Sequence, residues 1–132
     1  AGGTLAGKIF EMVAHDILRK GATFTVRQLT KDGIKQPEEL QLQNLPQKQF
    51  RNINEIVPEY YNIPENVNFE SVDSIAPQRN GIHHLYQITT AKTHDIKVNG
   101  LSKLENHLKD LLIHLYFVVP NMDDTFNNFR FQ

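Results

Sequence analysis

Residues 69–92 constrain the fold most strongly, because they read as two strands joined by a tight turn. Strand-forming runs lie on both sides of Arg79-Asn80-Gly81, which combines residues typical of short hairpin loops. The polar residues Asp73 and Gln87 lie within runs that would otherwise belong to the core. A hairpin that carries such residues inside its strands is where we expect functional chemistry.

The length of the hairpin loop decides which residue faces Asp73. A two-residue loop, Asn80-Gly81, would place Asp73 opposite Ile88 and on the reverse face from Gln87. A three-residue loop with Gly81 in the left-handed position places Asp73 directly across from Gln87. We favour the second register, since it gathers Asp73, Gln87 and Thr89 into one polar cluster whose hydrogen bonds are easier to satisfy.

A carboxylate beside an amide oxygen, with a further carboxylate nearby, forms an oxygen-rich site that suits Mg²⁺. Such a cation would activate water and neutralise charge on a phosphodiester. The simpler interpretation of the same spacing is that Asp73 and Gln87 only hydrogen-bond to each other within the sheet. His83 and His84 are adjacent in a strand, so they point to opposite faces and cannot chelate one ion together. We expect them to be packing or surface residues.

The N-terminal segment has the pattern of an amphipathic helix over residues 5–20, ended by Arg19-Lys20-Gly21. Lys8, Glu11 and His15 fall on the side opposite most of its apolar residues, which are Leu5, Ile9, Met12, Val13 and Ile17. A solvated face with an ordinary intrahelical pair is the simpler interpretation of that polar edge.

Further along, the sequence predicts a strand over residues 22–30 and an irregular, proline-containing insertion over 33–68 with one short helix near 47–56. Strands are predicted near 70–76 and 82–91, and a capping-box pattern starts a helix at Ser102. The apolar run 112–119 predicts a strand buried on both faces in the middle of the sheet. The pair Tyr60-Tyr61 has the chemistry to stack on bases, although a packing role is simpler. The fold expected is α/β (α+β), a mixed sheet of about four strands flanked by helices.

Composition bounds the classes of partner. The 132 residues fit a single domain spanning 1–132, and a net charge of −1 gives no overall basic footprint for nucleic acid. The absence of cysteine excludes disulfides and thiol chemistry and favours a reducing compartment. No apolar run reaches transmembrane length, so no membrane partner is expected. The chain reads as a fragment of a longer polypeptide.

Several segments resemble those of a known family, both in their amino-acid sequences and in their order along the chain. These are Leu5-Ala6-Gly7-Lys8-Ile9-Phe10-Glu11, Val72-Asp73-Ser74-Ile75, Leu85-Tyr86-Gln87-Ile88-Thr89, Ala91-Lys92-Thr93-His94, and Leu115-Tyr116-Phe117-Val118-Val119-Pro120. Together they resemble the C-terminal nuclease-like domain of Crinkler effectors and retrotransposon hot spot proteins. That domain is placed in the restriction-endonuclease-like, PD-(D/E)xK superfamily. Its core order of helix, three strands, helix and strand agrees with the order predicted above.

The resemblance implies a metal site at Glu11, Asp73 and Gln87 that holds Mg²⁺ or Mn²⁺. It also implies a lysine two residues after Gln87, where this chain has Thr89 instead. Threonine cannot supply a cation, so a lysine must reach the site from elsewhere or catalysis is lost. Lys92 is the nearest catalytic candidate, and further options are Lys97 and Lys103.

Two functions follow from the resemblance. The first is a metal-dependent endonuclease that hydrolyses phosphodiester bonds in DNA. The second is a catalytically degenerate copy that serves as a DNA- or protein-binding effector module. The family implies an effector that acts in the nucleus of a host cell or of the producing cell, in some cases after secretion. It also implies an adjoining nucleotide-hydrolase domain, and leaves the oligomeric state open.

Overall fold

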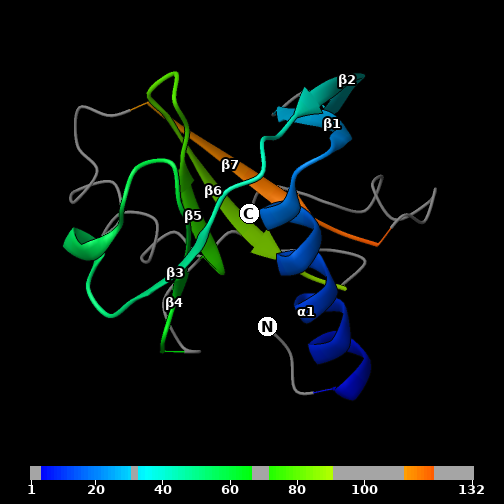
Figure 1. Ribbon diagram of the computed structural model, residues 1–132. Coiled ribbons are helices and arrows are strands. Elements are labelled where there is room, and N and C mark those ends of the chain that lie inside the picture. The colour runs from blue at the N-terminus through cyan, green and yellow to red at the C-terminus, as the bar shows by residue number, and fades with distance from the viewer. Residues whose placement is uncertain (1–3, 31–32, 67–71, 91–111, 121–132) are drawn as a thin grey trace.

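The computed structural model describes residues 4–30, 33–66, 72–90 and 112–120 (Figure 1). Within these ranges the chain is a mixed α/β protein, which confirms the predicted class. The elements, in chain order, are α1 (Leu5–Lys20), β1 (Thr23–Thr30), β2 (Gly33–Gln41), β3 (Gln47–Phe50), the 3-10 helix η1 (Ile53–Glu55), β4 (Tyr61–Pro64), β5 (Ser74–Pro77), β6 (Ile82–Ile88) and β7 (Leu112–Val118). The helix predicted to start at Ser102 lies outside the described residues.

Helix α1 has the boundaries that its sequence predicts. The Thr4 hydroxyl caps its first turn by accepting from the N–H of Gly7 at 3.0 Å. Gly21 ends it with φ 82° and ψ 152°, a conformation open essentially to glycine alone. A β-carbon at Gly21 would also collide with the backbone carbonyl of Leu42. Gly21 therefore both stops the helix and lets the chain pass close to residue 42.

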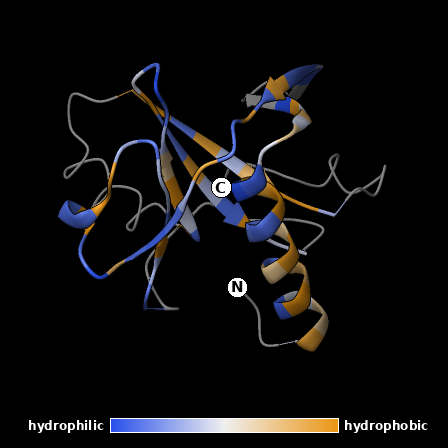
Figure 2. Ribbon diagram, viewed as in Figure 1, coloured by the Kyte–Doolittle hydropathy of each residue, from blue (hydrophilic) through white to orange (hydrophobic). Residues whose placement is uncertain are grey.

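The side of α1 that packs on the sheet is not the one its apolar pattern predicts. Ala14 and Leu18 are its buried residues. The predicted apolar stripe is exposed, with relative exposures of 45% to 74% at Leu5, Ile9, Met12, Val13 and Ile17. Figure 2, in which hydrophobic residues are orange, shows such residues along the length of the helix. The polar edge with Glu11 and His15 turns inward instead, because its side chains find polar partners on the sheet, as described below.

The region 33–68 is more regular than predicted. Its first part forms β2, which pairs antiparallel with β1 in a separate two-stranded sheet. Pro37 is accommodated there opposite Arg27, in a strand with only one neighbour. The helix predicted near 47–56 is wrong in its first half, where β3 forms, and only η1 is helical. Local propensity misses these strands because their pairing partners supply the hydrogen bonds.

The main sheet has five strands in the order β3-β4-β5-β6-β7, one more than expected. β4, β5 and β6 alternate in direction, whereas β3 runs parallel to β4 and β7 runs parallel to β6. Among the described strands β7 lies at an edge, whereas the sequence predicted a central position. Its side chains are exposed or half-buried rather than fully buried. Helix α1 crosses one face of this sheet (Figure 1).

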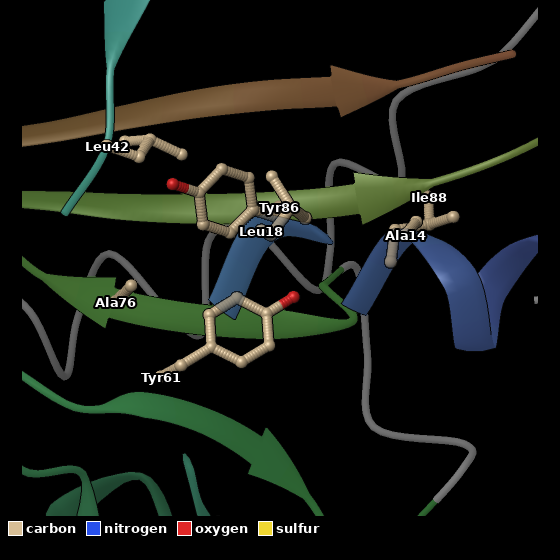
Figure 3. Close-up of a cluster of buried hydrophobic side chains, with 7 residues drawn as sticks. All are labelled: Ala14, Leu18, Leu42, Tyr61, Ala76, Tyr86 and Ile88. Atoms are coloured by element: carbon tan, nitrogen blue, oxygen red, sulfur yellow. The ribbon is translucent and has the colours of Figure 1, made fainter. Parts of the chain in front are cut away.

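Two hydrophobic clusters cover the two faces of the sheet. The cluster on the α1 face is shown in Figure 3 and consists of Ala14, Leu18, Leu42, Tyr61, Ala76, Tyr86 and Ile88. The cluster on the opposite face consists of Phe50, Val72, Ile75 and Leu85, with Ile53, Ile56, Ile113 and Leu115 packed against it. Successive residues of β5 and β6 alternate between the two clusters, as strand geometry requires.

The Asn62 side chain hydrogen-bonds β4 to the loop before it and to β5. Its amide group is fully buried and donates to the carbonyls of Val57 at 3.1 Å, Tyr60 at 3.0 Å and Ile75 at 3.1 Å. Its side-chain oxygen accepts from the N–H of Val57 at 3.0 Å. One side chain thus satisfies four backbone groups, and the adjacent Tyr61 is held in a fixed position.

Candidate functional site

The β5–β6 hairpin has the register that the three-residue loop predicts. The pairs run from Pro77 with His83 to Ser74 with Tyr86, so continuing the ladder would place Asp73 across from Gln87. Gly81 has φ 88°, and its N–H donates to the carbonyl of Gln78 at 3.0 Å. Glycine in the left-handed position of a three-residue loop is the arrangement expected.

At Asp73 the chain bends out of regular pairing. The N–H of Asp73 donates to the carbonyl of Tyr86 at 2.7 Å, and the Asp73 Oδ2 atom accepts from the N–H of Ile88 at 2.7 Å. The carboxylate therefore replaces the backbone carbonyl that would accept from an N–H in a regular ladder. Val72, just before the bend, is buried in the cluster on the face opposite α1. The Asp73 carboxylate instead acts electrostatically on His15 and Tyr61, which belong to the α1 face.

The bend separates Asp73 from Gln87, so the described residues do not form the expected polar cluster. Tyr86 and Ile88 belong to the cluster on the α1 face, so strand alternation directs Gln87 to the face of Leu85. Gln87 is buried there, with 8% of its surface exposed. Thr89 follows on a half-buried position, and its N–H donates to the carbonyl of Val118 at 3.0 Å. Lys92, like Lys97 and Lys103, lies outside the described residues.

Glu11 lies on the inner side of α1, one helical turn before His15. The Glu11 Oε1 atom is 3.6 Å from His15 Nε2, and the two side chains are 25% and 15% exposed, respectively. Glu11 is therefore the more exposed of the two side chains, and His15 lies closer to the interior of the protein. We name the set of Glu11, His15 and Asp73 the acidic edge.

His15 connects the acidic edge to the core through Tyr61 and Ser74. Its Nδ1 atom is 2.8 Å from the Tyr61 hydroxyl, and the two rings meet edge-on with centroids 5.7 Å apart. The Ser74 hydroxyl donates to the same Tyr61 oxygen at 2.8 Å. Tyr61 and Ser74 are fully buried, so these bonds form away from water.

The electrostatics follow from burial and from the two carboxylates. Burial lowers the pKa of His15, and the negative charges of Glu11 and Asp73 oppose this shift. Burial raises the pKa of the Tyr61 hydroxyl; the hydrogen bond from Ser74 opposes that shift, and the charges of Asp73 and Glu11 add to it. Burial therefore favours the neutral forms of both His15 and Tyr61.

A second histidine–tyrosine pair occupies the same face of the sheet. His84 Nδ1 is 3.0 Å from the Tyr86 hydroxyl, and its ring stacks at 6.3 Å on that of His114. Burial, assisted by the charge of His114, lowers the pKa of His84 to about 4. Figure 3 shows the Tyr61 and Tyr86 hydroxyls pointing in opposite directions, so each tyrosine serves a different histidine.

The acidic edge offers two carboxylates, Glu11 and Asp73, which are oxygen donors of the kind that hard divalent cations take. Magnesium commonly uses one or two protein carboxylates and completes its shell with water and phosphate oxygens. Glu11 and Asp73 match that demand, whereas Gln87 faces away. Within residues 4–30, 33–66, 72–90 and 112–120, no group of three or more His, Cys, Asp or Glu side chains is arranged to hold a metal ion. Any cation here would therefore rely on few protein ligands.

The sequence predicted an ordinary intrahelical pair for the helix edge with His15 and a packing role for Tyr61, and it placed neither of them, nor Ser74, in the site. For His15 there was a signal, because it follows Glu11 at the spacing of one helical turn. The pairing of Tyr61 with Ser74 and His15 had none, since it joins three elements that are distant in the chain. Tyr61 is wholly internal, which agrees with packing rather than base stacking, while Tyr60 is 36% exposed.

Comparisons with family models, curated proteins and solved structures find no match for this chain. No helix in the described part of the chain is long and apolar enough to cross a membrane.

Proposed function

We propose that this domain is a phosphodiesterase of the restriction-endonuclease-like type that acts on DNA with Mg²⁺ or Mn²⁺. The observation that carries the proposal is the convergence of Glu11 and Asp73 on His15. These carboxylates are far apart in the chain and act electrostatically on one half-buried imidazole. The order of α1, the antiparallel strands β4, β5 and β6, and the parallel β7 also supports it. So does the resemblance of the sequence to Crinkler nuclease-like domains.

Each residue has a defined task in this proposal. Glu11 and Asp73 would hold the cation, and the N–H of Ile88 fixes the Asp73 carboxylate through its Oδ2 atom. A cation held there would supply positive charge that neutralises phosphate oxygens and favours ionisation of water. Gln87 takes no part in this cation site. Lys92 remains the proposed source of the positive side chain that Thr89 does not provide.

A supercoiled-plasmid nicking assay with Mg²⁺ or Mn²⁺ tests the proposal. Asp73→Asn and Glu11→Gln should each lower the nicking rate by about 100-fold, the scale on which loss of one electrostatic contact to a transition state acts. The matched control is Glu38→Gln, which removes the same charge from an exposed position on β2. Equal nicking by wild type and by both site variants would reject the proposed site.

The second function is a degenerate nuclease fold that binds DNA or protein without cleavage. Two observations favour it: Thr89 stands where the family has lysine, and Gln87 points to the opposite face from Asp73. DNA binding that weakens with salt, persists in Asp73→Asn and never leads to nicking would establish this function. Binding that disappears with Asp73→Asn would argue against it.

A further inference from the structure

Three groups form a continuous chain of contacts that ends at Glu11. The Ser74 hydroxyl donates to the Tyr61 oxygen at 2.8 Å, and that oxygen is 2.8 Å from His15 Nδ1. On the other side of the ring, His15 Nε2 is 3.6 Å from Glu11 Oε1. This series of contacts runs from β5 through β4 to α1, so it links two strands of the sheet to the helix.

The hydrogen-bonding capacity of each group favours one direction for this series of contacts. Tyr61 has a single hydroxyl proton, and its oxygen already accepts from Ser74. His15 Nδ1, 2.8 Å from the Tyr61 oxygen, is positioned to accept that proton. A neutral imidazole with an accepting Nδ1 carries its proton on Nε2. In His15 this proton faces the Glu11 carboxylate.

We propose that Ser74 and Tyr61 hold His15 in the Nε2–H tautomer and so position the Glu11 carboxylate for cation binding. The proposal rests on the proposed function, because Glu11 is taken as a cation ligand. His15 is a positioning residue here, since it acts on the cation only through Glu11. Partners of this kind typically contribute 10- to 100-fold to metal affinity.

A second tyrosine of the protein provides a matched control for this series of contacts. Tyr86 is as buried as Tyr61, lies on the same face, and its hydroxyl is 3.0 Å from the Nδ1 of a histidine, His84. The contact of Tyr86 with the acidic edge is made by its backbone carbonyl, which accepts from the N–H of Asp73, and the Tyr86→Phe substitution leaves that bond in place. Tyr61→Phe and Tyr86→Phe therefore remove the same atom from the same kind of environment, and only the first interrupts the contacts to Glu11.

The test combines two measurements on the intact chain. The ¹⁵N chemical shifts of the histidine rings, recorded at about pH 8 where an ordinary histidine is neutral, report the tautomer. We expect wild-type His15 to be Nε2–H, and its Nδ1 shift to move toward the protonated value in Tyr61→Phe alone. Mn²⁺ affinity, measured by titration, should fall about 10- to 100-fold in Tyr61→Phe and stay within about threefold of wild type in Tyr86→Phe.

The tautomer of His15 decides the inference separately from the nuclease proposal. A wild-type His15 protonated on Nδ1 overturns it without any variant, so the test holds even if Tyr61→Phe fails to fold. Mn²⁺ affinity that is equal in the two phenylalanine variants, or absent from the wild type, also overturns it. Mn²⁺ binding that depends on Tyr61 in a protein that never nicks DNA would support the positioning chain and reject the nuclease function.

Discussion

The carboxylate of Asp73 and the backbone N–H of Ile88 lie 2.7 Å apart across the β5–β6 hairpin, at the point where regular pairing stops. One side chain therefore has two separable properties, an acceptor that stabilises the strand end and a charge that faces α1. Substitutions can remove them one at a time.

Asp73→Asn should preserve stability while removing the charge. Its side-chain oxygen can still accept from Ile88, so we expect the free energy of unfolding to change by less than about 1 kcal/mol. Asp73→Ala removes the acceptor as well and should cost about 1–3 kcal/mol. Urea unfolding of both variants measures the difference. Equal destabilisation would mean that the hydrogen bond to Ile88 does not contribute.

Gly21 and Gly81 should respond differently to alanine although both have positive φ. At Gly21 a β-carbon would lie 2.6 Å from the carbonyl carbon of Gln43, so strain and collision add, at about 3 kcal/mol or more. At Gly81 no atom lies within 4 Å of such a β-carbon, and only the backbone cost of about 1–2 kcal/mol remains. Thermal unfolding of the two variants should show the larger loss at Gly21, and the reverse order would contradict the packing described for Leu42.

Asn62→Asp should be among the most destabilising single-atom changes. A carboxylate cannot donate to the carbonyls of Val57, Tyr60 and Ile75, and it places a charge in a fully buried site. We expect a loss of roughly 3 kcal/mol or more in the free energy of unfolding. Asn54→Asp, at an exposed position on η1, is the matched control and should stay within about 0.5 kcal/mol. Similar losses at both positions would argue against the role of Asn62.

His84 should make stability depend on pH in a defined window. The folded protein protonates it only near pH 4, whereas an unfolded histidine takes up its proton near 6.5. Between these values the unfolded state binds more protons, so the free energy of unfolding falls as pH drops from 6.5 to about 4. The groups facing His84 are Tyr86, His114 and Tyr116.

Urea unfolding at several pH values should show a shallower slope in His84→Phe than in wild type. The variant also removes the hydrogen bond to Tyr86, so its absolute stability is lower. The slope with pH is therefore the decisive quantity. An unchanged slope would assign the pH dependence to other groups.

The register of the hairpin was predictable because strand periodicity and a three-residue loop ending in glycine leave few arrangements. The face of Asp73 was not, since a bend at one residue reverses what alternation predicts. That bend depends on the bond to Ile88, which local sequence does not reveal. The inward face of α1 escaped prediction for a similar reason. Apolar spacing favoured Ile9 and Val13, but polar partners on β4 and β5 hold His15 against the sheet.

The strands β2 and β3 show the same limit. Proline and polar residues in 33–68 argued against regular structure, yet the pairing of β2 with β1 and of β3 with β4 supplies the hydrogen bonds that local propensity does not. Predictions from a single sequence succeeded where a terminus or turn had its own signal, as at Gly21 and Gly81. They failed where the outcome depended on a distant partner.

The two strands that pair with β6 differ greatly in their sequence separation from it. β5 joins it through a three-residue loop, whereas each residue of β6 pairs with a residue of β7 that is 30 positions later. Short loops close sooner, so the hairpin should gain protected amides before β7 does during refolding. Pulse-labelling hydrogen exchange would show which of the two elements is protected first. Simultaneous protection of both would contradict this folding order. Asp73 and Ile88 would then meet early, while Glu11 reaches them only when α1 docks.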